Sequence, residues 1–354
     1  MVNSRRGLDM NIAKGDTATA GEASRASEAR LQPGQAGGLP DIEAPLLTVI
    51  VPAFNAGWCV GRALESVKRQ DFADFECIVV DDGSADDTAR RVEAEIAGDP
   101  RFRLIRQDNT GVSGARNRAL REARGRYVAN LDADDMWRPG FLQRAVDILE
   151  RSEPRPAMVF ARSLWINPDE TPVGGERRKP FGPIGYREIL LDNPIGNGSA
   201  AVMRRDAVLD CGGWDVDIVR IGQTEDWLLQ LQVATKGPVV PIDEQLVLYR
   251  VSEQGASAAV ERSARASLEV VRRCQRHGPR LRRTDYWMAR SVVLLWLLQR
   301  ARKMGRKELT PWLAANVYLR NPLWFTHPKL REPLVLAVTK RLGRLGRILR
   351  LRAG

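Results

Sequence analysis

Short apolar runs alternate with helix-like segments along residues 46–135, and this alternation restricts the fold more than any other feature of the sequence. The runs are LLTVIVPAFN, FECIVVDDGS, RFRLIRQDN and GRYVANLDADD, and they have the β-branched, apolar character of buried strands. The segments between them place apolar residues three or four positions apart, which predicts helices. Because strands and helices at this spacing form βαβ units, we expect an α/β fold with a mostly parallel sheet flanked by helices.

Polar and acidic side chains occur where these predicted strands end. In parallel sheets, ligands bind beyond the carboxyl ends of the strands. We therefore expect these side chains to converge on one cleft. They are Asn55, Asp81, Asp82, Asp132, Asp134 and Asp135.

The sequence Asp132-Ala133-Asp134-Asp135 is the sharpest local signal. Alternating carboxylates at a strand end can share Mg²⁺ or Mn²⁺, which completes its shell with water and substrate phosphates. Such a metal neutralises charge on a departing diphosphate. Taken alone, the motif is explained equally well as a solvated acidic turn.

Asp81 and Asp82 end an earlier strand and precede a Gly-Ser turn. A carboxylate there could accept hydrogen bonds from a nucleobase N–H or a ribose hydroxyl. The structural alternative is that Asp82 or Ser84 caps the following helix.

Residues 109–117 form a glycine-containing loop that opens a helix, and the N-terminus of a helix favours anions. Gly111 lies at the opening. Arg116 could reach a phosphate, clamp the acidic cluster or make a structural ion pair.

Glu225 and Asp226 form a second carboxylate pair, directly after Thr224. A carboxylate beside an acceptor hydroxyl can act as general base. Alternatively, the pair begins a helix that Thr224 caps. Acidic side chains in the first turn of a helix interact favourably with the positive end of the helix dipole. Trp137 and Trp227 follow the two acidic clusters and suit either a sugar face or the apolar core.

Six motifs, TVIVPAFN, VVDDGSADDT, QDNTGVSGARN, GRYVANLDADD, GGWD and TEDW, occur in an order that resembles glycosyltransferase family 2, which has the GT-A fold. The resemblance covers about Leu46 to Ser257. It implies an inverting transfer from a nucleoside-diphosphate sugar, with a UDP-sugar as the expected donor and Mn²⁺ or Mg²⁺ as cofactor. The acceptor would be a glycan or lipid-linked sugar in cell-surface polysaccharide or glycolipid assembly.

The resemblance also implies residue roles by position. The nucleoside would be held by Pro52, Ala53, Asn55, Asp81 and Asp82. Asp132 and Asp134 would be the metal-binding pair, with Asp134 the direct ligand. In the single-displacement mechanism that we expect, the metal and the loop from Gly111 to Arg116 hold the diphosphate. Asp226 would be the base and Glu225 its neighbour or an acceptor contact. From their position in or beside the acidic clusters, and not from the resemblance, we also expect Asp135, Trp137 and Trp227 on the acceptor side.

Departures from the family pattern narrow this expectation. The Q-x-x-R-W signature of processive synthases is absent, so we expect a non-processive enzyme. Where family members often have Gly-Glu-Asp, this chain has Gln-Thr-Glu-Asp.

Two alternative functions remain. A sugar-nucleotide nucleotidyltransferase would carry the motif G-x-G-x-R near the first strand, and the sequence PAFNAG does not contain it. A non-catalytic glycan-binding relative on the membrane surface is the other alternative, although the intact acidic residues argue against it.

Charge divides the chain into two parts. Residues 262–354 hold 23 basic and 4 acidic residues, whereas residues 1–261 hold 32 basic and 40 acidic residues. The sequence of segment 338–354 predicts a basic amphipathic helix. Such a helix could bind an anionic membrane surface, or it could pack on the catalytic domain as a structural element. Its apolar face consists of Val338, Leu342, Leu345 and Leu349. Nucleic acid is not an expected partner, because no RNA-recognition motif is present.

Three segments are therefore expected: a disordered leader over residues 1–44, a GT-A domain over 45–257 and a basic helical region over 258–354. The four cysteines have no metal-site spacing and there are only two histidines, which argues against a zinc site. No signal-peptide core or spanning apolar stretch is found. We expect a cytoplasmic protein that contacts the inner face of the plasma membrane only peripherally.

Overall fold

The computed structural model describes residues 44–175, 182–251, 260–303, 305, 310–318, 321, 323–326 and 330–331. Almost all of the predicted leader and the whole of the predicted amphipathic helix at 338–354 lie outside the described residues. The expected domain boundary at residue 257 does so as well.

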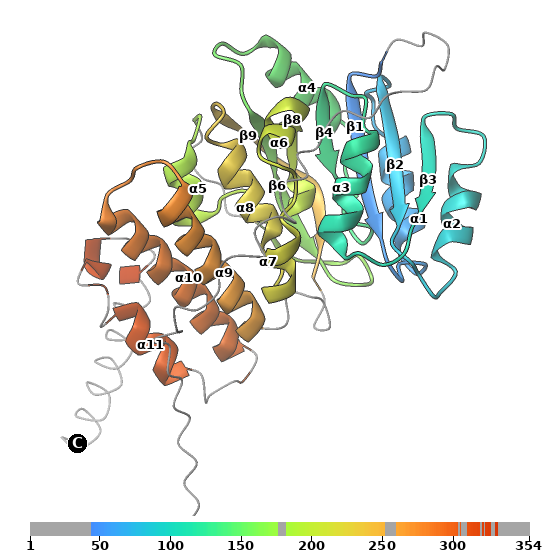
Figure 1. The fold of residues 1–354 in the computed structure, drawn as a ribbon. Coiled ribbons are helices and arrows are strands. Elements are labelled where there is room, and N and C mark those ends of the chain that lie inside the picture. The colour runs from blue at the N-terminus through green and yellow to red at the C-terminus, as the bar shows by residue number, and fades with distance from the viewer. Residues whose placement is uncertain are drawn as a thin grey trace, which may run out of the picture. The chain divides into compact units, whose positions relative to one another are not determined.

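A nine-stranded sheet forms the centre of the fold, in the order β3-β2-β1-β4-β8-β6-β9-β5, with β7 paired to β6 (Figure 1). Its first half is parallel, as predicted. Leu47 of the central strand lies opposite Phe75 on one side and Tyr127 on the other. The strands of this half are β1 (Leu47–Ala53), β2 (Phe75–Asp81), β3 (Phe102–Arg106) and β4 (Tyr127–Asn130).

The second half of the sheet is mixed, so the prediction of a mostly parallel sheet holds for the first half alone. β8 runs antiparallel to both β4 and β6, β9 runs parallel to β6, and β5 and β7 are antiparallel to their neighbours. These strands are β5 (Met136–Trp137), β6 (Met158–Ile166), β7 (Pro172–Gly175), β8 (Ala201–Arg204) and β9 (Val239–Arg250).

The strand order explains where the first helices lie. The chain moves outward from β1 to β2 and β3 and then returns to β4 on the other side of β1. Because crossover connections are right-handed, α1 and α2 cover one face and α3 covers the opposite face (Figure 1). The return also creates a switch point between β1 and β4, where sheets of this kind bind ligands. The helices of this half are α1 (Val60–Lys68), α2 (Thr88–Ile96), α3 (Val112–Glu122) and α4 (Phe141–Arg151).

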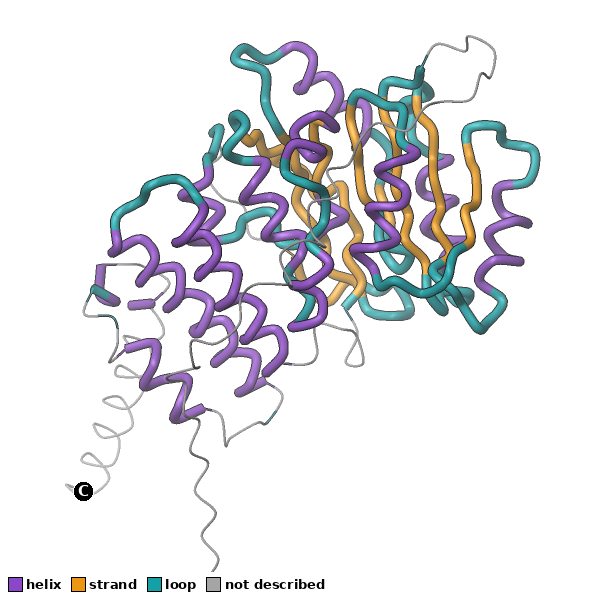
Figure 2. Tube along the Cα trace, viewed as in Figure 1, coloured by secondary structure: helices purple, strands orange, loops and turns teal. Residues whose placement is uncertain are grey.

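Short helices separate the later strands, and Figure 2 shows how loops connect them. They are α5 (Tyr186–Asp192), η2 (Gly198–Ala200), α6 (Arg205–Asp210), α7 (Val216–Ile221) and α8 (Glu225–Val233). α8 begins at the predicted carboxylate pair. Thr224 holds its N-cap position, but the Thr224 side chain makes no capping hydrogen bond.

The C-terminal region is helical, as predicted. α9 packs against α7, and α10 packs against α9, α5 and α11. Its helices are α9 (Val260–His277), α10 (Arg283–Lys303), α11 (Thr310–Tyr318) and η4 (Trp324–Thr326). Val270 of α9 and Leu294 of α10 are buried in the same apolar core as Leu47 of the sheet. Within the described ranges, no helix has the length and apolarity required to cross a membrane.

Candidate active site

Arg116 lies at the centre of the site, on α3, with a side chain that is 2% exposed. Its Nε donates to Asn130 Oδ1 at 2.9 Å, and its Nη2 donates to Asp132 Oδ1 at 2.7 Å. Its Nη1 lies 2.7 Å from Glu225 Oε1 and 2.9 Å from Asp226 Oδ1. One buried guanidinium therefore joins the end of β4 to the start of α8, and it brings the two predicted acidic clusters into one site.

The charges of this cluster do not balance. One guanidinium faces the three carboxylates of Asp132, Glu225 and Asp226, and Glu225 Oε2 is buried without a donor among the described residues. Burial alone would lower the pKa of Arg116, but the three carboxylates raise it above its ordinary value, so the guanidinium stays charged. The site retains surplus negative charge, which favours a cationic partner.

The two carboxylate oxygens of Asp226 differ, because Oδ1 has protein partners and Oδ2 has none among the described residues. Trp214 Nε1 donates to its Oδ1 at 3.2 Å, which is also the atom paired with Arg116. Its Oδ2 has no donor in the part of the chain that the structure describes, and the side chain is 21% exposed. Burial raises the pKa of Asp226 to about 7, with repulsion from Glu225 and Asp132 adding to the rise and Arg116 opposing it. A carboxylate with this pKa can take a proton near neutral pH.

The segments around Asp226 are tightly fitted. Asn117 Nδ2 donates to Trp214 O at 2.7 Å, and Trp214 N donates to Asn117 Oδ1 at 2.8 Å, which fixes the GGWD loop to α3. On the other side, a Cβ added at Gly198 would overlap the Asp226 carboxylate. Roles for Trp214, Asn117 and Gly198 were not predicted from the sequence. The GGWD motif for Trp214 and the end of the QDNTGVSGARN motif for Asn117 were the signals that could have indicated such roles.

Asp132 and Asp134 differ in their surroundings. Asp132 Oδ1 accepts a hydrogen bond from Asn130 Nδ2 at 3.0 Å in addition to the one from Arg116. The Asp134 carboxylate is exposed, and apart from its own amide no group of the described residues donates to it. Partial desolvation and the charge of Asp132 raise the pKa of Asp134 to about 6.

These residues fit a divalent cation, with Asp134 offering a free carboxylate and Asp132 its second oxygen. The surplus negative charge around them is what a hard cation with oxygen ligands would neutralise. Across the described ranges, however, no three His, Cys, Asp or Glu side chains are grouped as a preformed metal site.

Asp135, Trp137 and Trp227, which we expected on the acceptor side, lie in the core instead. Asp135 is 1% exposed and accepts hydrogen bonds from Ser199 Oγ at 2.6 Å and Arg250 N at 2.8 Å. The indoles of Trp137 and Trp227 donate to backbone carbonyl oxygens and are 3% and 7% exposed. All three side chains therefore have structural positions, and the two tryptophan rings are buried away from any ligand.

Asp82 fixes the loop that opens α3. It accepts hydrogen bonds from Thr110 N at 2.9 Å, Gly111 N at 2.8 Å and Gln107 Nε2 at 2.7 Å. Gly111 has a φ of 81°, a left-handed conformation that favours glycine. Because these donors belong to the loop before α3, Asp82 does not cap α2. Its contribution is to set the start of α3 and, through it, the position of Arg116.

The predicted nucleoside residues come together at the ends of β1 and β2. Asp82 N donates to Ala53 O at 2.9 Å, and Asn55 Oδ1 accepts from Ala85 N at 2.9 Å. Asp81 is 2% exposed and accepts from Ser84 N at 3.1 Å. Pro52 and Ala53 are buried within β1, while Asn55 is exposed.

Comparison with known proteins assigns this arrangement to a family. The model of glycosyl transferase family 2 matches residues 48–212. An uncharacterized glycosyltransferase of Nostoc sp. is 36% identical over 239 residues, which cover 64% of this chain and 73% of that protein. The chain belongs to glycosyltransferase family 2.

Two further relatives of this family 2 chain are matched over only part of their length. Chondroitin synthase of Escherichia coli is 39% identical over 103 residues, 29% of this chain and 15% of the synthase. Succinoglycan biosynthesis protein ExoO of Rhizobium meliloti is 42% identical over 125 residues, 35% of this chain and 34% of that protein.

Solved structures agree with the fold of this family 2 chain. TarS of S. aureus, residues 1–349, superposes with a TM-score of 0.56 at 20% identity, covering 77% of this chain and 78% of TarS. A mannosyltransferase of Pyrobaculum calidifontis, in complex with GDP-Man and Mn²⁺, gives 0.53 at 22% identity and covers 88% and 90% of the two chains. The predicted GT-A fold is confirmed.

The family 2 site has a further wall, Arg250 and Trp58, that the sequence analysis missed. The Arg250 side chain is 3% exposed, and its Nε donates to Asp134 O at 2.8 Å. Its guanidinium lies 5.5 Å from the centre of the Trp58 ring, which is 61% exposed. Arg250 therefore supports the backbone of Asp134, and Trp58 forms an exposed rim above it.

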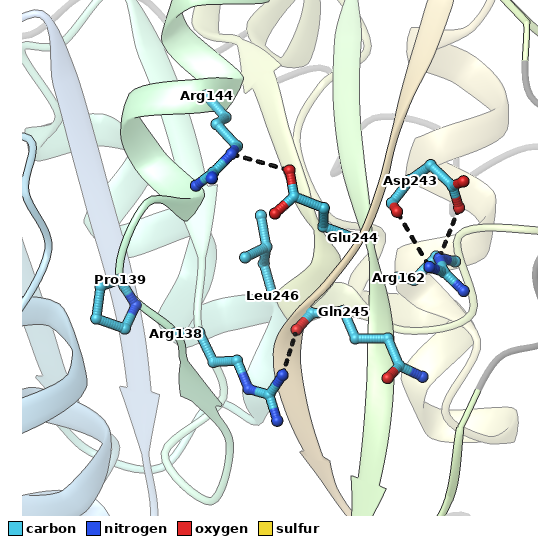
Figure 3. A pocket seen from close by; sticks show the side chains of 8 residues that line it. All are labelled: Arg138, Pro139, Arg144, Arg162, Asp243, Glu244, Gln245 and Leu246. Carbon is cyan, nitrogen blue, oxygen red and sulfur yellow. Dashed lines mark hydrogen bonds and ion pairs between the residues drawn. The ribbon is translucent and has the colours of Figure 1, made fainter.

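A separate pocket of about 550 Å³ opens along β9 (Figure 3). Four of its five charged residues are paired, since Arg144 pairs with Glu244 at 3.0 Å and Arg162 pairs with Asp243 at 3.0 Å. The fifth, Arg138, donates from Nη1 to Gln245 O at 3.2 Å. Arg116 and its carboxylates do not line this pocket. The remaining lining residues are Arg138, Pro139, Gln245 and Leu246.

Proposed function

We propose that this protein is an inverting, non-processive glycosyltransferase that moves a sugar from a nucleoside-diphosphate sugar to an acceptor hydroxyl. One observation carries the proposal: Arg116 binds the Asp132 carboxylate and the Glu225-Asp226 pair at 2.7 to 2.9 Å. Residues for the donor diphosphate and for the acceptor proton are thereby held in one site. Membership of family 2 supports the same reaction class.

Asp226 is the proposed base. Its Oδ1 is fixed by Arg116 and Trp214, so Oδ2 is left to accept the proton of the acceptor hydroxyl. The acceptor oxygen attacks the anomeric carbon as its proton moves to Asp226. The bond between that carbon and the diphosphate oxygen breaks on the opposite face, and the nucleoside diphosphate leaves with the bonding electrons. A single displacement of this kind inverts the anomeric centre.

Asp132 and Asp134 are the proposed ligands of a Mn²⁺ or Mg²⁺ ion. When bound, such an ion would neutralise charge on the departing diphosphate. The Mn²⁺ in the mannosyltransferase structure, a protein of similar fold, supports this part of the proposal. The chain's own contribution is the exposed Asp134 carboxylate and the Arg250 contact that holds its backbone.

The donor is proposed to be a UDP-sugar. The nucleoside would lie against Pro52, Ala53, Asn55, Asp81 and Asp82 at the ends of β1 and β2. Two structures of TarS in complex with UDP and UDP-GlcNAc support a uridine donor. The GDP-Man complex of the mannosyltransferase identifies the competing donor class.

The acceptor is proposed to be a glycan or lipid-linked sugar of cell-surface polysaccharide assembly. The relative named for succinoglycan biosynthesis supports this assignment. The enzyme would work in the cytoplasm, peripherally on the inner face of the plasma membrane, where segment 338–354 would contact anionic lipid.

A donor panel tests the proposal. Purified protein with Mn²⁺ is given each candidate sugar nucleotide, and released nucleoside diphosphate is measured, with Asp226→Asn as the matched inactive control. We expect release from one nucleotide class and near-background release from the variant when acceptor is present. Binding of no sugar nucleotide by calorimetry would contradict the proposal.

A further inference from the structure

The turn between α9 and α10 is rich in arginine. Residues 272–290 contain seven arginines, one acidic residue and no lysine. Three of these arginines are ion-paired within the fold. Arg272 pairs with Glu269 and Arg273 with Asp215, both at 2.5 Å, and Arg282 lies 3.6 Å from Asp285. Arg276, Arg280 and Arg283 are exposed and have no ion pair among the described residues.

The turn is rigidly built. The Tyr286 hydroxyl lies 3.1 Å from the carbonyl oxygens of both Cys274 and Pro279. Asp285 is 4% exposed and accepts hydrogen bonds from Arg187 Nη2 at 2.8 Å and Arg282 N at 3.2 Å. The three unpaired arginines therefore belong to a turn that is held by internal hydrogen bonds. The turn leads into α10, which packs against α5 (Figure 1).

An exposed aromatic side chain continues this surface. Trp287 is 44% exposed and lies one turn after Arg283 on the same face of α10. Met288 and Ala289, which follow it, are buried on the opposite side. An indole beside guanidinium groups suits a membrane–water interface, where Trp is enriched because its ring is apolar and its N–H is polar.

We propose that Arg276, Arg280, Arg283 and Trp287, the arginine turn, dock this protein on an anionic phospholipid surface. Guanidinium groups bind phosphate oxygens through paired N–H donors. Charge polarity orients the protein, because residues 262–354 carry 23 basic and 4 acidic residues whereas residues 1–261 have an acidic excess. A lipid partner is favoured over RNA because the basic segment 338–354 also contains leucines among its arginines. Basic sequences that alternate with apolar residues are typical of segments that bind at a membrane interface.

Co-sedimentation of the full chain with vesicles tests this surface. The vesicles are mixed phosphatidylcholine and phosphatidylglycerol, with pure phosphatidylcholine as the uncharged comparison. Arg280→Gln/Arg283→Gln should lower the partition coefficient by about 30-fold, from roughly 1 kcal/mol per basic residue near an anionic surface. Arg121→Gln/Arg155→Gln, which removes two exposed arginines outside the turn, should leave the partition coefficient nearly unchanged.

Two more variants separate charge from shape. Arg280→Lys/Arg283→Lys keeps the charge and should retain most of the binding. Trp287→Ala should weaken binding even at about 0.5 M salt, where ionic contacts at the surface are largely screened. All variants keep the tail at 338–354, so a loss of binding is due to the turn.

Unchanged vesicle binding in the double glutamine variant would overturn the proposal. So would tighter binding to single-stranded poly(U) RNA than to vesicles, lost in the same variant, since it would assign the turn to nucleic acid. No transfer assay enters this experiment. Its outcome is therefore independent of the proposed reaction.

Discussion

Arg116 and Asp226 form an ion pair of 2.9 Å between α3 and the first turn of α8. The pair leaves Asp226 Oδ2 open while fixing Oδ1, and the same guanidinium binds Asp132. The proposed base and one of the two proposed metal ligands, Asp132, thus share one buried cation. This arrangement makes separate predictions for stability, pH dependence, metal use and catalysis.

Removing Arg116 should destabilise the fold. Arg116→Ala leaves the carboxylates of Asp132, Glu225 and Asp226 without their cation, and the loss of one partner from a buried ion pair costs about 3–5 kcal/mol. Arg121→Ala, at an exposed position of the same helix, should cost less than about 0.5 kcal/mol. Urea unfolding of the two variants measures the difference. Equal midpoints would show that Arg116 is not needed to hold the cluster.

The first half of the site could be predicted from sequence because its signals are local. Asp81 and Asp82 stand at the end of β2, Asp132 and Asp134 follow β4, and the carboxyl ends of parallel strands meet at one edge. Asp81, Asp82, Asp132 and Asp134 were located in this way. The contact between Arg116 and Glu225 could not be predicted, because 109 positions separate the two residues. The spacing of apolar residues predicts local secondary structure and does not predict contacts between distant parts of the chain.

The mixed half of the sheet was also beyond local signals. β8 lies between β4 and β6 and runs antiparallel to both, which depends on the path of the intervening chain and not on the apolar pattern of its four residues. Trp137 and Trp227 show the same limit. A tryptophan beside an acidic motif looks the same in the sequence whether its ring is buried or exposed. In this structure both indoles donate to backbone carbonyl oxygens inside the core.

Activity should depend on pH through Asp226. Burial raises the pKa of this carboxyl to about 7, and a general base works only when deprotonated. The value of kcat/KM should therefore rise with pH and be about tenfold lower at pH 6 than at pH 8. Rates from pH 5.5 to 9 on one buffer series at constant ionic strength measure this. A flat profile through pH 7 would contradict a base with this pKa.

Metal removal and Asp134→Asn should act on the same step. Both should abolish transfer and weaken donor binding, because Asp134 is the free carboxylate proposed to hold the cation that faces the diphosphate. Asp74→Asn, at an exposed position outside the site, is the matched control. Assays with EDTA, and with Mn²⁺ restored, measure the effect. Full transfer in EDTA would refute the metal-dependent mechanism.

Deleting residues 338–354 should leave transfer to a soluble acceptor intact and reduce binding to anionic vesicles. Each basic residue near such a surface contributes roughly 1 kcal/mol. Vesicle co-sedimentation beside a transfer assay measures both quantities. Unchanged vesicle binding would assign the segment a structural role or another partner.

In the proposed reaction Asp226 removes the acceptor proton, and the substitution Asp226→Asn tests this role. The variant keeps the size of the side chain but cannot take a proton, and Asp217→Asn on α7 serves as the control. Donor binding by calorimetry and transfer rate are measured on the same preparations. We expect donor affinity near the wild-type value and a kcat lower by roughly 10²–10⁴. Transfer at the wild-type rate would contradict it and move the search for the base to Glu225 or another residue of the acceptor side.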